Sequence, residues 1–177
     1  MNPLLNTNEA KLVRMRAFGE KYLYSLPKRI LMFPQIHINY FAVLASFGVE
    51  VGLGYFWYGR WFGKAWSREL GFAPNSGPMP SMMRRARFWR WASLLFTILV
   101  LAFASELIRP STWGMGVDGP AWIYGLVIAL AAWGGFCLTP LLSRVAWEGA
   151  SWRLVHIHGG YHLVGLLIVC QILAWWP

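Results

Sequence analysis

Four long apolar stretches constrain the fold of this chain more than any other feature. They cover residues 36–58, 88–108, 121–142 and 154–176. Each is close to the length of about 20 residues that a helix needs to cross a bilayer. A helix is the single-segment structure that satisfies every backbone polar group within lipid. We therefore predict an all-α, polytopic membrane protein with four transmembrane helices.

The composition supports this assignment. Of 177 residues, 57% are hydrophobic and 13% are charged, and the mean hydropathy is +0.43. A soluble domain carries about 25% charged residues. The chain has too few charges to cover the surface of a water-soluble globule, which argues against a cytosolic enzyme and against an ordinary nucleic-acid-binding domain.

The net charge of +9 comes from 16 Lys and Arg against 7 Asp and Glu. The basic residues lie in the first 35 residues and between the apolar stretches, with few inside them. This placement is typical of contact with anionic lipid headgroups, so we expect the lipid bilayer as a partner and no nucleic acid. Cys137 and Cys170 lie inside apolar stretches, so no disulfide framework is expected.

The chain divides into a basic N-terminal extension, residues 1–35, and a transmembrane domain, residues 36–177. Within the extension, apolar side chains recur at helical spacing over residues 8–25, with Lys and Arg on the other face. The pattern predicts an amphipathic helix. Such a helix lies on the membrane surface or docks on a partner subunit, because the same apolar stripe serves both.

The tryptophans indicate where the membrane interfaces lie. We call side A the membrane side at which the first span begins, and side B the opposite side. Seven tryptophans fall near side B, four near side A, and Trp133 lies in mid-span. Such aromatic belts are typical of transmembrane helices. The basic residues close to the spans favour side B as cytoplasmic, whereas export of the basic extension argues against it, so the orientation stays open.

Charged groups inside spans are candidates for function. Glu50 in the first span and His162 in the fourth are each eight residues from the side-B end of their spans, about 12 Å deep at 1.5 Å per residue. We expect them to form a polar intramembrane pair. Three roles fit this pair: a clamp between helices, a proton relay or small-solute site, or a ligand set for a metal or tetrapyrrole.

The fourth span opens with a histidine-rich segment that supplies further candidate ligand-binding residues. These are His156, His158, Tyr161 and His162. His158 and His162 are four residues apart and share one helical face, a spacing that lets two imidazoles hold one metal, with Glu50 as a third ligand. His156 points elsewhere. The sequence requires no cofactor, and the metal is unknown.

Two runs around the first span carry a family resemblance. Residues 38–44 (INYFAVL) and 57–66 (WYGRWFGKAW) resemble the domain-of-unknown-function 1761 family of small bacterial membrane proteins. The resemblance resumes at residues 147–152 and 160–164 and covers most of residues 36–177. It implies a four-helix membrane domain with no assigned activity.

The resemblance also implies a set of motif positions. These are Asn39, Trp57, Tyr58, Gly63, Lys64, Trp66, Glu148, Tyr161 and His162. The chain departs from the family pattern in its extension and at Arg60, where a proline is common. His156 and His158 are particular to this sequence.

The chain shows no Ser–His–Asp or Cys–His constellation, phosphate loop or pair of catalytic carboxylates, so we do not predict an enzyme. We interpret the protein as an accessory or structural subunit of a larger membrane complex in the bacterial cytoplasmic membrane. The alternatives are a small proton-coupled transporter and a metal- or tetrapyrrole-binding protein centred on Glu50, His158 and His162.

Overall fold

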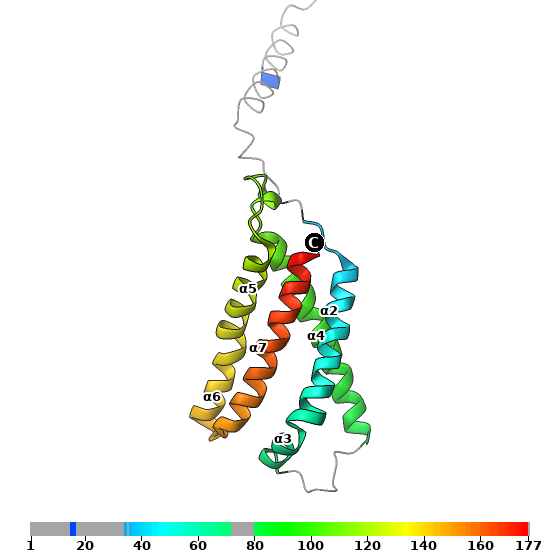
Figure 1. The fold of residues 1–177 in the computed structure, drawn as a ribbon, viewed down its shortest axis with the longest axis vertical. Coiled ribbons are helices and arrows are strands. Elements are labelled where there is room, and N and C mark those ends of the chain that lie inside the picture. Colours follow the sequence, from blue (N-terminus) through cyan, green and yellow to red (C-terminus); the bar gives the residue numbers. More distant parts are fainter. Residues whose placement is uncertain (1–14, 17–33, 35, 72–79, 177) are drawn as a thin grey trace, which may run out of the picture. The chain divides into compact units, whose positions relative to one another are not determined.

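The computed structural model describes residues 15–16, 34, 36–71 and 80–176, without the side chains of residues 80–83. The account below concerns the unit Gln35–Pro177, whose helices are shown in Figure 1. The predicted amphipathic helix at residues 8–25 lies outside the described residues, apart from Met15 and Arg16. These two residues are helical and exposed.

Every described element of this unit is helical, which confirms the all-α prediction. The elements are α2 (Tyr40–Tyr55), η2 (Phe56–Trp61), α3 (Gly63–Glu69), α4 (Pro80–Leu107), η3 (Ser111–Trp113), α5 (Ala121–Ala132), η4 (Trp133–Leu138), α6 (Thr139–Glu148) and α7 (Trp152–Trp175). Four segments within the described residues are long and apolar enough to cross a membrane: Tyr40–Trp61, Arg84–Leu107, Ala121–Glu148 and Trp152–Trp175.

The predicted ends of the spans differ from the observed ones. The first helix begins at Tyr40 rather than at residue 36, because the side chain of Asn39 caps it by accepting hydrogen bonds from the backbone N–H groups of Phe41 and Ala42. The second begins at Pro80 rather than at residue 88, and the third continues to Glu148. Helices extend past the apolar core because their long Arg side chains reach water at the interface.

The third span changes its winding in the middle. It begins as α5, passes through the π-helical turn η4 and ends as α6. Pro140, near the start of α6, has no N–H group to continue the α-helical ladder, and the hydroxyl of Thr139 donates to the carbonyl groups of Gly134 and Gly135. A π-turn accommodates this interruption without ending the span.

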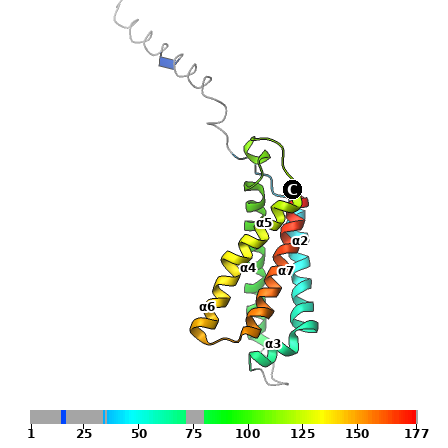
Figure 2. The ribbon, with the colours of Figure 1, turned by 60° about the vertical axis from the view of Figure 1, so that its left-hand side comes forward.

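Helix α7 is the central element of the bundle. It contacts each of the other three spans, and Figures 1 and 2 show it between α2 on one side and α5 and α6 on the other. In the side-A half, α5 and α7 approach closely at Gly125, where an added Cβ would lie 2.9 Å from the carbonyl oxygen of Cys170. The fully buried core residues include Ala129, Ile98 and Cys170.

At the side-B end, α3 is held against the start of α7. The hydroxyl of Ser151 donates to Glu69 over 2.6 Å, and Arg153 lies 3.6 Å from the other oxygen of the same carboxylate. Ser151 also caps α7 by accepting from the N–H of Leu154. These contacts fix the turn between the first and second spans relative to α7.

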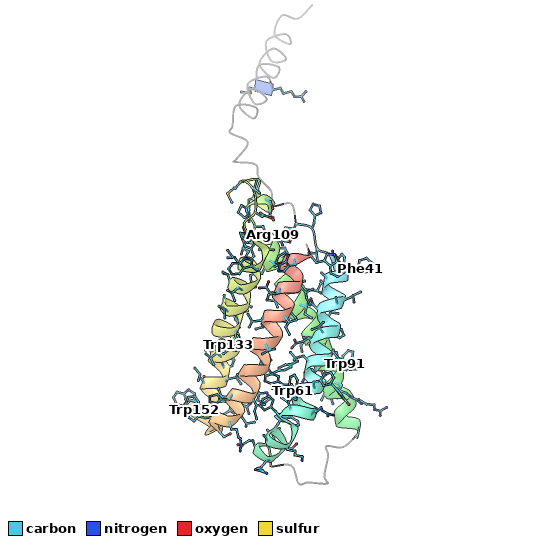
Figure 3. The ribbon with its side chains drawn as sticks, viewed as in Figure 1. Phe41, Trp61, Trp91, Arg109, Trp133 and Trp152 are labelled. Atoms are coloured by element: carbon cyan, nitrogen blue, oxygen red, sulfur yellow. The ribbon has the colours of Figure 1, made fainter. Side chains whose placement is uncertain are left out.

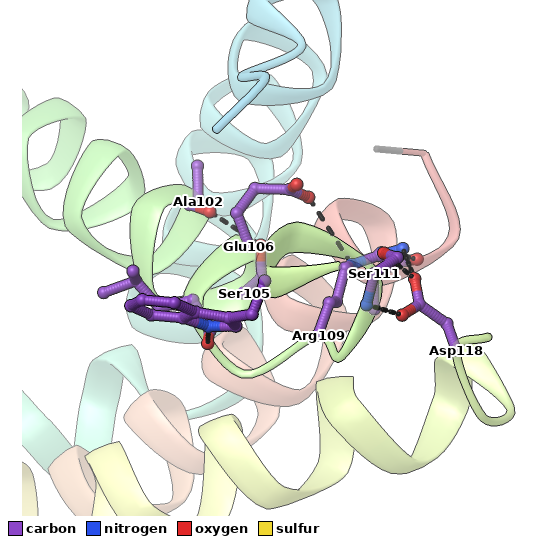
Figure 4. A network of polar contacts seen from close by, with 9 residues as sticks. Ala102, Ser105, Glu106, Arg109, Ser111 and Asp118 are labelled. Atoms are coloured by element: carbon purple, nitrogen blue, oxygen red, sulfur yellow. Dashed lines mark hydrogen bonds and ion pairs between the residues drawn. The ribbon is translucent and has the colours of Figure 1, made fainter. Parts of the chain in front are cut away.

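At the side-A end, the residues Glu106, Arg109, Ser111 and Asp118 form a connected group that we call the side-A cluster (Figure 4). The Arg109 guanidinium lies 3.4 Å from Glu106 and 3.5 Å from Asp118, and it donates to the carbonyl oxygen of Ala174 over 2.6 Å. Glu106 and Arg109 are both buried. The cluster therefore ties the end of α4, the following loop and the end of α7 together.

Asp118 lies outside the spans and also accepts from the backbone N–H and the hydroxyl of Ser111, at 2.9 and 2.7 Å. Partial burial acts to raise the pKa of Asp118. The hydrogen bonds from Ser111 and the charge of Arg109 outweigh burial, so the pKa lies below its ordinary value.

Labelled tryptophans mark the side-B end of the bundle. Figure 3 places Trp61 and Trp152 at the end opposite Arg109, and Trp133 nearer the middle. Trp61 and Trp152 are largely exposed in the protein alone. This arrangement is typical of aromatic side chains at a membrane interface.

Candidate functional site

A cavity of about 430 Å³ lies in the side-B half of the bundle, between α2, α4 and α7. The polar or ionisable side chains on its walls include Glu50, Tyr58, Arg90, His158, Tyr161 and His162. Its apolar walls include Leu94, Ile98, Leu101, Leu166 and Val169. We call it the side-B cavity. Its volume falls within the range of small-ligand pockets, about 300–1,000 Å³.

Glu50 is the most deeply buried acidic group of the cavity, with 6% of its surface exposed. Its carboxylate lies against Gly165 of α7, where an added Cβ would overlap Oε2 and lie 2.7 Å from Oε1. Among the described residues, Oε2 has no hydrogen-bond partner. The glycine therefore makes room for a carboxyl group whose second oxygen is left unsatisfied.

Arg90 of α4 carries the positive charge of the cavity. It donates to the hydroxyl of Tyr161 over 3.0 Å, and its guanidinium carbon lies 5.7 Å and 5.5 Å from the ring centroids of Tyr58 and Tyr161. Gly54 admits the guanidinium, since an added Cβ would lie 2.6 Å from Nη2. No acidic side chain within the described part of the chain forms an ion pair with Arg90.

Tyr161 joins the basic and acidic groups of the site. Besides accepting from Arg90, its hydroxyl donates to the backbone carbonyl of Glu50 over 3.4 Å. It is buried, and its ring lies 5.0 Å from that of Tyr58. The Tyr58 hydroxyl in turn lies 2.8 Å from Nδ1 of His158. These contacts connect α2, α4 and α7 around the cavity.

The three histidines of the fourth span occupy different environments. His158 and His162 both line the cavity, whereas His156 does not. His156 is exposed, and its Nδ1 lies 2.7 Å from the carbonyl oxygen of Trp152. The i, i+4 spacing of His158 and His162 thus places them on one wall of the site.

The predicted pair of Glu50 and His162 meets only in part. Both residues line the same cavity, but no hydrogen bond or ion pair within the described residues joins them. The Glu50 carboxylate lies against Gly165 instead. In the described ranges there is also no group of three or more His, Cys, Asp or Glu side chains arranged to hold a metal ion.

Most of the motif positions before the second span organise the turn at side B. The indole of Trp57 donates to the carbonyl of Ile157 over 3.0 Å. Gly63 allows the chain to turn, because an added Cβ would lie 2.6 Å from the carbonyl oxygen of Tyr58. The ring of Trp66 lies 5.7 Å from that of Tyr58, and both residues line the cavity.

The remaining motif positions lie away from the cavity. Asn39 caps α2 at the opposite end. Lys64 is exposed. Glu148 forms an exposed ion pair of 3.0 Å with Arg144 one turn before it.

Sequence reasoning missed Arg90, Gly54 and Gly165. In the sequence, Arg90 belongs to the basic residues that lead into the second span, yet Arg90, Ser93 and Thr97 recur at helical spacing and all line the cavity. That polar stripe on an apolar helix is the signal that points to the site. The glycines gave no such signal, because their role depends on side chains from another helix.

Comparison with known proteins identifies the family alone. The family model described as a protein of unknown function (DUF1761) matches residues 41–174. No curated protein and no solved structure matches the chain.

Proposed function

Because the chain belongs to the DUF1761 family, whose function is unknown, we propose a function from the side-B cavity itself: the protein binds a small ligand within the membrane. One observation carries this proposal. Three different helices direct polar side chains at one cavity of about 430 Å³, and the buried Oε2 of Glu50 is left without a partner among the described residues.

The energetic cost of such an arrangement supports a binding role. Ionisable groups within a membrane cost several kcal/mol unless they are paired or face a polar cavity. A purely structural clamp would pair its charges within the bundle, as the side-A cluster does for Arg109 with Glu106 and Asp118, although Nε of Arg109 also lacks a hydrogen-bond partner among the described residues. An incompletely satisfied set beside an open volume is what a ligand completes.

Two neighbouring leucines allow a matched test. Leu94 lines the cavity, and Leu95, next to it on α4, is exposed outside it. We expect wild-type protein and Leu95→Trp, purified gently, to retain the same small molecule in native mass spectrometry, and Leu94→Trp to lose it. Equal retention by both variants, or a wild-type protein free of small molecules, contradicts the proposal.

Proton-coupled transport is the second candidate, and the buried Oε2 of Glu50 favours it. A carboxyl group in that position avoids an unpaired charge by carrying a proton, which it can exchange through the cavity. Proteoliposomes containing a pH-sensitive dye test this. Proton uptake down an imposed gradient should be lost in Glu50→Gln and kept in Glu148→Gln, whose carboxylate is exposed. Identical uptake by both variants excludes the relay.

The tetrapyrrole alternative has the simplest test. His158 or His162 would hold such a group from the cavity wall through its imidazole nitrogen. A visible absorption band in the purified protein, removed by His158→Gln or His162→Gln and kept in His156→Gln, would support it. A colourless protein excludes it.

We also propose, from the sequence, that the protein is a non-enzymatic accessory subunit of a complex in the bacterial cytoplasmic membrane. The exposed apolar surface supports this: of the most apolar stretch of the third span, 17% is buried within the protein, compared with 50% for α7. Co-purification from native membranes in mild detergent tests it. A monomer without any partner under several gentle conditions counts against it.

A further inference from the structure

The side-B cavity has two chemically different ends. Near side B its wall carries Arg90, Tyr58, His158 and His162, whereas deeper in the membrane it carries mainly the apolar residues Ile98, Leu101, Leu166 and Val169. The Glu50 carboxylate lies at Gly165, between His162 and Leu166 along α7. From Arg90 to Leu101 along α4 is about 16 Å at 1.5 Å per residue. A ligand that fills this volume therefore has a polar head near side B and an apolar body towards the middle of the bilayer.

Arg90 determines the charge of that head. A guanidinium offers five N–H donors in a planar fork, and one of them is used in the bond to Tyr161. The rings of Tyr58 and Tyr161 hold the guanidinium in place from the side. By contrast, Arg109, Arg144 and Arg153 each pair with an acidic side chain. The fork of Arg90 remains suited to a carboxylate or a phosphate.

Glu50 interacts electrostatically with this charge but, among the described residues, does not form an ion pair with it. Its carboxylate is turned against Gly165. The Tyr161 hydroxyl lies between them, accepting from Arg90 and donating to the Glu50 carbonyl. Tyr161 therefore contacts both Arg90 and Glu50, and Arg90 keeps further N–H donors for an anion.

Resting on the proposed binding function, we propose that the ligand is an anionic amphiphile: a carboxylate or phosphate head bound by Arg90, with a single alkyl chain along Ile98, Leu101, Leu166 and Val169. The volume of about 430 Å³ lies in the lower part of the range for small-ligand pockets, which fits one chain. Side chains exposed on α4, Ser93 and Thr97 among them, leave the cavity accessible from the lipid.

Cys137 is a reporter within the cavity. It lies on the cavity wall and is partly exposed, whereas Cys170 is buried in the core. In Cys170→Ala protein in nanodiscs of zwitterionic lipid, the rate of Cys137 modification by a maleimide measures access. The probes are laurate, dodecyl phosphate, dodecanol and inorganic phosphate. At ten times its Kd, a protecting ligand slows modification about tenfold, since the free fraction falls by that factor.

We expect laurate, dodecyl phosphate or both to protect Cys137, and dodecanol and inorganic phosphate not to protect it. If only laurate protects, the head of the ligand is a carboxylate; if only dodecyl phosphate protects, the head is a phosphate. Arg90→Gln should abolish protection, Arg90→Lys should keep part of it, and Arg85→Gln, which removes an exposed charge from the same helix, should leave it intact.

The outcomes separate the two proposals. Protection by dodecanol equal to that by laurate, or protection that survives in Arg90→Gln, overturns the anionic head but leaves a binding cavity. Protection by inorganic phosphate alone overturns the amphiphile. If no probe protects Cys137, the anionic amphiphile is wrong; if wild-type protein also carries no small molecule, the binding function fails with it.

Discussion

Arg90, in the second span, and Arg109, just after its end, show how differently the two ends of the bundle are built. Arg109 is buried and contacts Glu106, Asp118 and the carbonyl of Ala174. Arg90 is exposed in the protein alone, lines the side-B cavity and donates to a tyrosine hydroxyl. The charge of Arg109 is paired within the protein, whereas Arg90 has no ion-pair partner among the described residues and leaves donors for a ligand. Pairing, rather than the presence of charge, distinguishes a structural cluster from a binding site.

The packing of the helices follows the same division. At the side-A end, Gly125 leaves no room for a methyl group against the α7 backbone. At the side-B end, Gly165 makes room for a carboxyl group, and a cavity lies beside it. We expect the stability of the protein to depend on packing at the side-A end, and ligand binding to depend on the side-B end.

The largest effect should come from Arg109→Met. This change keeps an apolar stem but leaves the buried Glu106 without its cation, which costs about 3–5 kcal/mol for a buried pair. Unfolding in mixed detergent micelles measures the loss. Arg144→Met is the control, because its ion pair with Glu148 is exposed and worth less than about 1 kcal/mol. Similar losses in both variants would contradict a structural role particular to the side-A cluster.

Gly125→Ala should have the next largest effect. The added methyl group would press on the Cys170 carbonyl at 2.9 Å, and such overpacking costs about 1–3 kcal/mol. Gly134→Ala in the same span has no atom within 4 Å of its added Cβ and should be close to neutral. The thermal unfolding temperatures of the two variants measure this difference. If Gly125→Ala leaves the unfolding temperature unchanged, α5 and α7 are not tightly packed at this position.

Asp118→Asn tests the loop of the side-A cluster through pH. Because the pKa of Asp118 is lowered in the folded protein, its contribution is complete above the ordinary value of about 3.9 and is lost as the pH falls through the lowered pKa. We expect a loss of about 1 kcal/mol at pH 7 that shrinks towards zero in strong acid. Thermal unfolding across this range measures it, and a difference independent of pH would be inconsistent with the ion pair.

The smallest change in stability should come from Glu50→Gln. Its Oε2 has no partner among the described residues, so replacing the carboxyl group by an amide of the same shape should change the free energy of unfolding by less than about 1 kcal/mol. The same substitution at Glu106 removes a charge from Arg109 and should cost more. If Glu50→Gln were the more damaging variant, the two ends would not differ as described.

Local patterns predicted much of this structure. The spans were found because apolarity and length are properties of the segment itself. The i, i+4 spacing of His158 and His162 predicts that they share one helical face, and both line the cavity together with the candidate residue Tyr161. Glu50 and His162 were placed at one depth by counting residues, but counting could not show that the Glu50 carboxylate turns towards Gly165.

What the sequence missed depends on other helices. The sequence indicates only an interfacial charge at Arg90, because its tyrosine partners come from η2 and α7. The sequence does not predict a role for Asp118, because its ion pair with Arg109 depends on the conformation of the loop between α4 and α5. The π-turn η4 and the exact ends of the spans were also beyond composition alone.

The sequence by itself determined that this protein lies in a membrane as four helices, because lipid offers no partner for backbone polar groups and each segment carries enough apolar surface alone. It did not determine which polar groups are satisfied. Arg90 and Arg109 are the same residue type near opposite ends of one span. In the tertiary structure, Arg109 pairs with two carboxylates, whereas Arg90 lines a cavity. That difference arises because partners come from separate helices and meet only when the bundle packs.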